Sequence, residues 1–203
     1  MRKLILTIAV LVTSLASFNL NAQAVKKGDV LVDTYYGVVN LFNLAFKGTL
    51  GSVASNASTS SIDHLGVRGE YMLIDKFGVG LDIDFNKVDV SYSTITTENS
   101  NTVIYTYNIG SQNIRSSASF NFHFADSDKL DAYLGLGAGY NYRSYTASST
   151  DAGYSYTASG AITPIAFKLA LGMRYFFTDN LGANFAMGIG QGGLINGGLS
   201  FKF

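Results

Sequence analysis

Hydrophobic and polar residues alternate with a period of two along most of the chain beyond residue 24. The clearest stretch places five apolar side chains on one face: Phe77, Val79, Leu81, Ile83 and Phe85. Glycine, aspartate and asparagine fill the opposite face. Such alternation predicts β-strands with two chemically different faces. Eight segments follow this rule, at about 29–40, 62–74, 77–92, 103–124, 130–146, 161–177, 180–190 and 194–203.

The connections between these segments alternate in length. Short polar turns are expected at 75–76, 125–129 and 178–180, and long Ser/Thr/Asn-rich loops at about 43–61, 93–102 and 147–160. Antiparallel strands place all the short turns at one end and the loops at the other. The apolar face changes parity near Asn86-Lys87 and Gly110-Ser111, which predicts a β-bulge at each place and a projecting hairpin. The expected fold is all-β, an eight-stranded antiparallel up-and-down β-barrel.

The direction in which the apolar face points follows from volume. A soluble barrel with an apolar interior would show the same alternation. However, the interior of an eight-stranded barrel is just wide enough for its own side chains, and it cannot hold this many bulky ones. It can hold the opposite set, which is rich in Gly, Ala, Ser and Asn. We therefore expect the bulky face to point outward into lipid, which makes the barrel transmembrane.

Aromatic side chains gather at both ends of the predicted strands, as expected for girdles at the two membrane interfaces. One group lies near the short turns and comprises Tyr71, Phe77, Phe122, Phe124, Tyr175, Phe177, Phe201 and Phe203. The other group lies towards the loops and comprises Tyr36, Phe85, Tyr92, Tyr105, Tyr140 and Tyr142.

The first residues have the pattern of a secretory signal peptide. Arg2 and Lys3 precede an apolar run, Leu4 to Leu15, which is too short to span a bilayer as a helix. Ala22-Gln23-Ala24 has the small-x-small form of a cleavage site. We expect residues 1–22 to be a signal for the Sec pathway, with cleavage between 22 and 24, and residues 25–203 to form the barrel domain.

Composition narrows the classes of function. Charged residues make up 14% of the chain, against about 25% in soluble domains. Without Arg2 and Lys3, 12 basic and 14 acidic residues remain, a net charge of −2, which argues against a nucleic-acid partner. The chain has no cysteine, which removes disulfides, thiolate catalysis and cysteine metal sites.

The chain ends in a motif that resembles the C-terminal assembly signal of outer-membrane barrels. Its positions are filled by Asn196, Gly198, Phe201 and the terminal aromatic Phe203. With the signal peptide and the alternating strands, this motif makes the chain resemble the porin-like outer-membrane β-barrel domain family, whose smaller members are of the OmpA/OmpX type. The turn around residues 175–181 is typical of that family. The resemblance implies location in the outer membrane, with lipid, the barrel assembly machinery and periplasmic chaperones as partners.

Ionisable residues with inward parity form the most specific candidate site. Around a turn at Asp75, Arg68 should face Asp82 and Glu70 should face Gly80, with Asp84 within diagonal reach of Arg68. The full set comprises Arg68, Glu70, Asp82, Asp84, Asp131, Arg143, Lys168, Arg174 and Lys202, and Asp33 would balance the two signs. One interpretation is a balanced polar plug that closes the lumen. The other is a narrow polar pathway for water or small solutes.

Two histidines are the natural acid–base candidates. His64, near Asp63, Ser60 and Ser61, is expected at the outer end of its strand, and His123 is expected to point inward near the short turns. Some eight-stranded barrels are lipid A-modifying enzymes that use a His with a Ser and an acid, but serine is too common here to make this a signal. The sequence shows no metal-site spacing and implies no cofactor.

The leading hypothesis is a non-enzymatic integral outer-membrane protein with a structural or surface-interaction role. The alternatives are a narrow channel or small-solute carrier, and a lipid A-modifying enzyme. The loop 147–160 and the hairpin around 88–107 could bind an external partner, because protruding strand edges accept further strands. The sequence does not identify that partner.

Overall fold

The computed structural model describes residues 23–51, 56–98, 100–152, 154–160 and 164–203. The predicted signal peptide, residues 1–22, lies outside these described residues. Cleavage and export by the Sec pathway therefore stay predictions.

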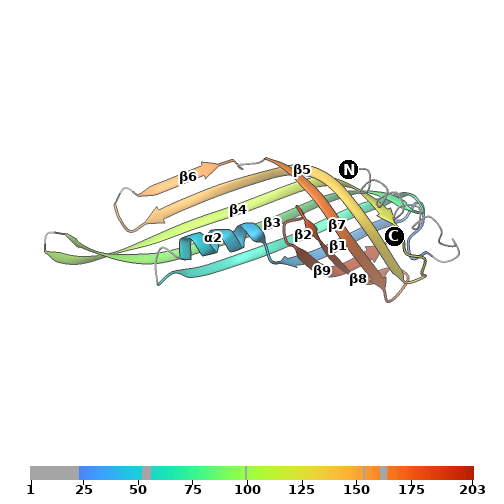
Figure 1. Cartoon of the computed structure of the whole chain (residues 1–203), viewed down its shortest axis with the longest axis horizontal. Coiled ribbons are helices and arrows are strands. Elements are labelled where there is room, and N and C mark those ends of the chain that lie inside the picture. Colours follow the sequence, from blue (N-terminus) through green and yellow to red (C-terminus); the bar gives the residue numbers. More distant parts are fainter. Residues whose placement is uncertain (1–22, 52–55, 99, 153, 161–163) are drawn as a thin grey trace, which may run out of the picture.

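Eight strands close into a ring in which each strand pairs antiparallel with its neighbours (Figure 1). Pairing of the first strand with the last closes the ring, from Leu31 opposite Lys202 to Val38 opposite Ile195. The predicted up-and-down barrel is confirmed. The ring consists of β1 (Val30–Val38), β2 (Ser58–Ile74), β3 (Phe77–Glu98), β4 (Asn101–His123), β5 (Leu130–Ser149), β7 (Ile165–Phe176), β8 (Leu181–Ile189) and β9 (Ile195–Lys202).

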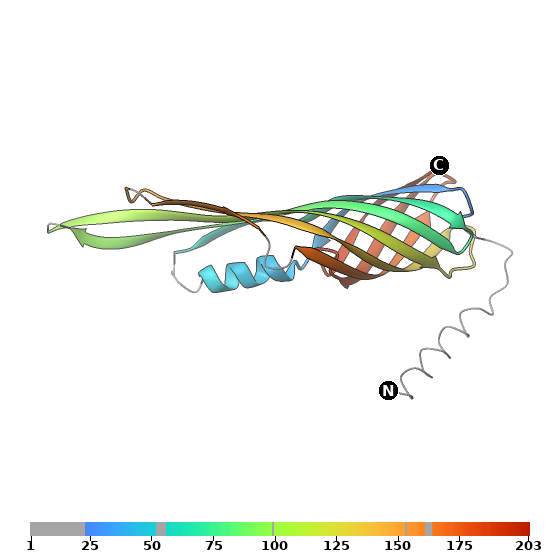
Figure 2. The same ribbon diagram turned by 90° about the horizontal axis from the view of Figure 1, so that it is seen from above.

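Four neighbouring strands are much longer than the rest and extend beyond the ring as one sheet (Figures 1 and 2). β3 and β4 have 22 and 23 residues, whereas β1 and β9 have 9 and 8. The short strand β6 (Ser155–Ser159) pairs with the far end of β5. We call the part of β2–β6 beyond the ring the extension. The loops expected at 93–102 and 147–160 are therefore wrong, because much of each range is paired strand.

A helix, α2 (Leu41–Gly51), lies along the extension where a loop over 43–61 was expected (Figure 2). Asn40 begins the helix, with its side-chain oxygen accepting hydrogen bonds from the backbone N–H groups of Phe42 and Asn43. The Asn43 and Lys47 side chains then bond to residues 61–63 of β2. These contacts fix α2 on the extension.

None of the described helices combines the length and the apolar character that crossing a membrane would require.

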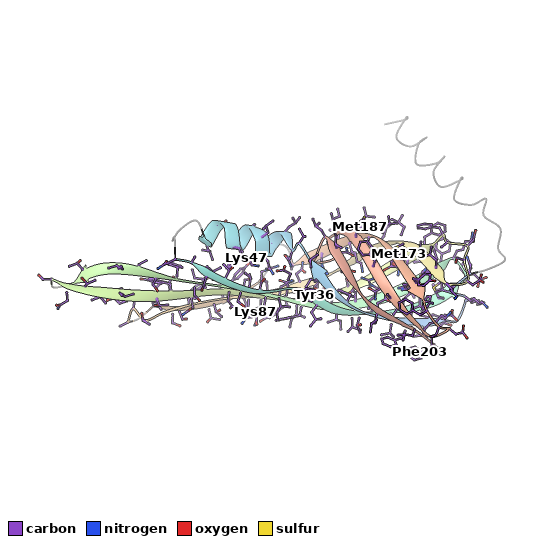
Figure 3. All side chains as sticks on the ribbon, turned by 90° about the horizontal axis from the view of Figure 1, so that it is seen from below. Tyr36, Lys47, Lys87, Met173, Met187 and Phe203 are labelled. Atoms are coloured by element: carbon purple, nitrogen blue, oxygen red, sulfur yellow. The ribbon has the colours of Figure 1, made fainter. Side chains whose placement is uncertain are left out.

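The distribution of side chains is the reverse of that in a soluble protein. The buried set is dominated by polar and charged residues, among them Asp33, Arg68 and Arg174. The exposed set is dominated by large apolar residues, such as Leu81 at 70% exposure and Phe167 at 73%. In Figure 3, side chains such as Met173 and Met187 project from the barrel wall. The prediction that the bulky face points outward is confirmed.

The bulges predicted near Asn86-Lys87 and Gly110-Ser111 are wrong. β3 and β4 pair without a register shift from Phe77 opposite Phe122 to Glu98 opposite Asn101. A register shift instead occurs in β2, between Ile62 and Leu65. The apolar residues Val88 and Val90 are fully buried on the face that continues the lumen.

The change of polarity therefore reflects a change of surroundings along continuous strands. The last outward apolar row pairs Phe85 with Ile114 and Ile114 with Tyr142. The next outward row pairs Lys87 with Gln112 and Gln112 with Ser144. An outward face that is apolar below this level and polar above it fits strands that leave lipid and enter water.

The lower aromatic group packs as expected near the short turns, and the upper one needs a correction. Phe77 contacts Phe120 and Phe122, with ring centroids 5.3 and 5.1 Å apart. Tyr92, assigned to the upper girdle, instead lies in the extension and stacks on Tyr107 at 5.3 Å, on the face that continues the lumen. Tyr105 lies on the same face as Tyr107 by strand alternation.

Because β3 passes from lipid into water, the effect of an added outward charge on stability should depend strongly on its position along the strand. Leu81→Lys places a cation on the lipid-facing wall and should cost about 2–4 kcal/mol in the free energy of unfolding, whereas Ser91→Lys in the extension should cost at most about 1 kcal/mol. Urea titration of both variants folded in lipid vesicles checks this. Equal costs would contradict the assigned boundary.

Candidate functional site

The candidate site is the lumen, which inward side chains from every strand of the ring fill. Seven of the nine predicted residues are buried there: Arg68, Glu70, Asp82, Asp84, Asp131, Lys168 and Arg174. The register places Arg68 opposite Asp82 and Glu70 opposite Gly80. The structure thus brings most of the set together, whereas Arg143 and Lys202 lie at the two ends of the lumen.

Arg174, on β7, forms the centre of the lower layer. Its guanidinium donates to Asp33 from Nε and from one terminal nitrogen, at 2.9 to 3.1 Å. It also donates to Glu70 at 2.7 Å and to Asp131 at 2.8 Å. The Tyr133 ring lies 4.5 Å from the guanidinium carbon. One fully buried cation therefore links β1, β2, β5 and β7.

His123, on β4, closes the same layer. Its Nδ1 lies 2.7 Å from Asp131 Oδ1, and its Nε2 lies 2.9 Å from Glu70 Oε1. An ionised carboxylate only accepts hydrogen bonds, so an imidazolium that donates from both ring nitrogens satisfies this geometry. Asn121 donates to the same Glu70 oxygen at 2.7 Å, and Ser200 donates to Asp33 at 2.6 Å.

The middle layer is centred on Asp82. Arg68 Nε donates to Asp82 at 3.1 Å, and Lys168 Nζ donates to the same oxygen at 2.8 Å. The Tyr35 hydroxyl donates to the other oxygen of Asp82. A terminal nitrogen of Arg68 also donates to the Tyr133 hydroxyl at 2.6 Å, which joins the middle layer to the lower one.

The upper layer consists of Asp84, Arg115 and His64. Asp84 lies 2.5 Å from Arg115 and 3.2 Å from His64 Nδ1, and it does not pair with Arg68 as sequence reasoning allowed. Arg115 also donates to the carbonyl of Gly190. Gly192, with a φ of +94°, lies against His64, where an added side chain would overlap the imidazole ring.

Sequence reasoning missed one residue of this layer, Arg115, and misplaced another, His64. Arg115 has inward parity with Ser117 and Ser119, so alternation alone could have found it. His64 was expected beside Ser60 and Ser61 at the outer end of its strand, but it points into the lumen, with its ring 5.2 Å from that of Tyr35. The Ser61 hydroxyl instead donates to Asp63 and accepts from Lys47. The structure does not assemble the His–Ser–acid arrangement considered for a lipid-modifying enzyme.

The end of the lumen at the short turns is closed by an apolar cluster. This cluster consists of Ala24, Val25, Leu31, Met72 and Phe176. Lys202 lies above the Phe176 ring at 4.8 Å and donates to the carbonyl of Ala24 at 2.7 Å. Residues 24 and 25 therefore fold back into the barrel end rather than continuing away from it.

Opposite charges nearly balance in the described lumen. Five carboxylates are buried there, and Arg68, Arg115, Lys168 and Arg174 supply four basic side chains. His123, between Glu70 and Asp131, supplies the position for a fifth. Buried ions persist when they are paired and hydrogen-bonded, and each partner removed leaves an uncompensated charge. The network therefore rigidly fills the lower and middle lumen.

Above the upper layer lies a polar chamber of about 330 Å³, which we call the outer chamber. It is lined by the start of α2, by inward residues of β3, β4 and β5, and by the outer ends of β7 and β8 with Gly190, Gly192, Gly193 and Leu194 of the link that follows. Arg143 lines one side of the chamber, and its guanidinium carbon lies 3.5 Å from the centre of the Phe42 ring. Within the described ranges no group of His, Cys, Asp and Glu residues is arranged to hold a metal ion.

A closed β-barrel with a lipid-facing apolar wall and an ion-paired polar interior defines the class of outer-membrane β-barrels. A sequence model of the outer membrane protein beta-barrel domain family matches residues 8–199, and the chain belongs to this family. The protein is thus an outer-membrane β-barrel protein. A search of curated proteins gives no significant match.

Solved structures with a similar arrangement include three small barrels. The N-terminal β-barrel domain of OprF from Pseudomonas aeruginosa is 16% identical, with a TM-score of 0.42, covering 88% of this chain and 100% of that one. OprG from the same organism is 17% identical, with a TM-score of 0.43, covering 90% and 99%. Ail from Yersinia pestis, in complex with a heparin analogue, is 11% identical, with a TM-score of 0.41, covering 87% and 99%.

The residues of the predicted assembly signal lie on both faces of the last strand or beside its end. Asn196 is buried in the lumen, Gly198 shares its face, and Phe201 lies on the outer face. Phe203 is exposed at the end of the barrel (Figure 3), and its backbone pairs with that of Val30. Recognition by the assembly machinery stays a prediction.

Removal of the central cation should destabilise the barrel strongly. Arg174→Met leaves Asp33, Glu70 and Asp131 without their shared partner, and the expected loss in the free energy of unfolding is about 3–5 kcal/mol. The matched change Arg143→Met removes an arginine that has no carboxylate partner among the described residues, and it should cost less than about 1 kcal/mol. Urea unfolding in detergent micelles compares them; similar losses would contradict the central position of Arg174.

Proposed function

We propose that this protein is a membrane-anchored surface-interaction protein, in which a sealed barrel holds the extension at the cell surface for contact with an external partner. The observation that carries the proposal is the combination of a closed lumen with strands that continue far beyond the lipid level. A transport protein needs an open lumen, whereas an anchor does not.

The sealed lumen supports the anchoring half of the proposal. From the short-turn end outward, the lumen is filled by the apolar cluster around Phe176, the layer around Arg174, and the layer around Asp82. The Arg68 and Arg174 side chains, among the largest in the chain, are fully buried. Paired ions of this kind are costly to separate, so the layers resist opening.

The inner face of the extension supports the interaction half. Tyr92 stacks on Tyr107, and Tyr154 contacts Tyr107 edge-on at 5.2 Å. Tyr156, on β6, is 61% exposed. Tyrosine combines a large, rigid apolar ring with a hydroxyl that bonds to a partner, which is why it is enriched in binding surfaces. These side chains form a surface suited to protein or polysaccharide contact.

The edge of the extension offers a second mode of contact. In the described sheet the strand order ends at β6, which pairs with β5 on one side. A strand edge of this kind can accept a strand from a partner through main-chain hydrogen bonds. The tyrosine surface would then contribute side-chain contacts beside the added strand.

Helix α2 makes the extension rigid enough for such a role. It packs on β2 and β3, where Val88 and Val90 are fully buried. Lys47 also pairs with Asp63 at 3.8 Å. A surface held in one conformation loses less entropy on binding, which raises the affinity that the same contacts give.

Conductance separates the proposal from the alternative of a narrow channel. In planar bilayers, the purified barrel should give no stable conductance steps, because the ion-paired layers fill the lumen. Lys168→Met serves as the diagnostic variant. Steps in the wild type that change size in this variant would favour transport and count against a sealed anchor.

Photocrosslinking on intact cells tests the interaction surface. A photoreactive residue in place of Tyr156 should form adducts with extracellular protein or polysaccharide. The same residue in place of Phe167, which is exposed on the barrel wall, should form adducts with lipid only. The proposal fails if the two positions give the same adducts or if Tyr156 gives none.

A further inference from the structure

The outer chamber is a separate feature from the interaction surface, and its walls follow a regular pattern. Asn86 of β3 lies opposite Asn113 of β4, which lies opposite Arg143 of β5. One row further in, Arg115 lies opposite Asn141. Three amides and two guanidiniums thus lie side by side on three neighbouring strands, and all five side chains line the chamber.

The chamber is electropositive. Two arginines line it, and none of its described lining residues is a carboxylate. Asp84 pairs with Arg115 from below. Arg143 has no carboxylate within 4.0 Å in the described part of the chain, and its contacts are the Phe42 ring and the Ser111 hydroxyl at 3.3 Å. One guanidinium is therefore available to an anion.

Buried polar atoms in the walls lack partners. Asn86 Oδ1 and Asn113 Oδ1 accept no hydrogen bond, although both residues are almost completely buried. Arg115 Nε donates none. Buried polar groups are normally satisfied by protein or by ordered water, so these atoms are open to a bound molecule that supplies both donors and acceptors.

From these observations, we propose that the outer chamber binds a small organic anion that also carries hydroxyl groups, of the sugar-acid class. The carboxylate would pair with Arg143, since guanidinium and carboxylate match in a two-point hydrogen bond. The hydroxyls would donate to Asn86 and Asn113 and accept from Arg115. The volume of about 330 Å³ is at the small end for ligand sites and fits one sugar unit.

The unpaired amide oxygens distinguish this ligand from a simple anion. Inorganic phosphate as a dianion would meet Arg143, but its unprotonated oxygens would face the oxygens of Asn86 and Asn113. A neutral sugar would satisfy the amides and leave Arg143 without a counter-charge. The chamber therefore favours a ligand that carries both functions.

Isothermal titration of the barrel in detergent micelles tests the proposal with D-glucuronate, D-glucose and inorganic phosphate as probes. Glucuronate should bind at least about tenfold more tightly than either of the other two. Arg143→Gln and Asn113→Ala should each weaken its binding about tenfold or more. Lys87→Gln, on the outward face of β3, should leave binding unchanged.

Retained heat-modifiable migration in gels shows that each variant is folded. If Arg143→Gln does not fold, chemical shifts of the Asn113 and Asn141 amides in the wild type locate the binding directly. If a methyl glycoside of glucuronate binds as well as the free acid, this supports the end of a polysaccharide chain as the natural ligand. Weaker binding of the glycoside supports a free solute. No binding of glucuronate, equal binding of glucose or phosphate, or shifts that avoid the chamber would overturn the proposal.

Discussion

The narrow interior of a ring of eight strands is the constraint on which the structure depends. Such a ring cannot enclose its bulky apolar side chains, so they face lipid and the polar side chains face one another. Charges taken from water must then be paired, and they are: Arg174 contacts three carboxylates, and Asp82 contacts two cations. The ion pairs are therefore a consequence of the geometry of the ring, and they fill its lower and middle lumen.

The same strands serve two surroundings. β3 and β4 keep one register along their whole length, yet their outward residues change from apolar to polar between Phe85 and Lys87. Within lipid, the outward face is apolar and the inner face polar. In the extension, the inner face carries Val88, Val90 and tyrosines, and the outward face is polar. This reversal lets the same strands continue from lipid into water without any break in the hydrogen-bonded ladder.

Alternation allowed much of this to be predicted, because the face of a strand residue is a local property. It gave the ring of strands, the outward direction of Phe77 to Phe85, and the cross-strand pair of Arg68 and Asp82. Arg115 was available from the same rule. His64 shares the inward parity of Arg68 and Glu70, so the same rule could have found it; it was misplaced because it was grouped with the nearby Ser60 and Ser61.

The features that were not predicted depend on the surroundings of each strand, which the local sequence does not reveal. Strands that pass through water have polar outward faces, so the outer end of the β3–β4 hairpin, within 93–102, and β6 were mistaken for loops. The same change of solvent was mistaken for two bulges. Helix α2 is short and contains Gly48 and Thr49, which are weak helix formers, and its contacts with residues 61–63 of β2 support it. Asp84 lies directly opposite Arg115 on neighbouring strands, whereas the contacts of Arg174 with Asp33 and Glu70 required the closed ring.

The most direct measurement is the environment of spin labels on single cysteines along β3, in a chain that has no native cysteine. Labels at Leu81 and Ile83 should collide with oxygen dissolved in lipid, and a label at Ser91 should collide with a water-soluble nickel chelate. A label at Val90 should be shielded from both, under α2. Collision of the Val90 label with lipid oxygen would mean that the strand turns over above Phe85, and it would contradict the continuous strand and the closed, polar interior derived from it.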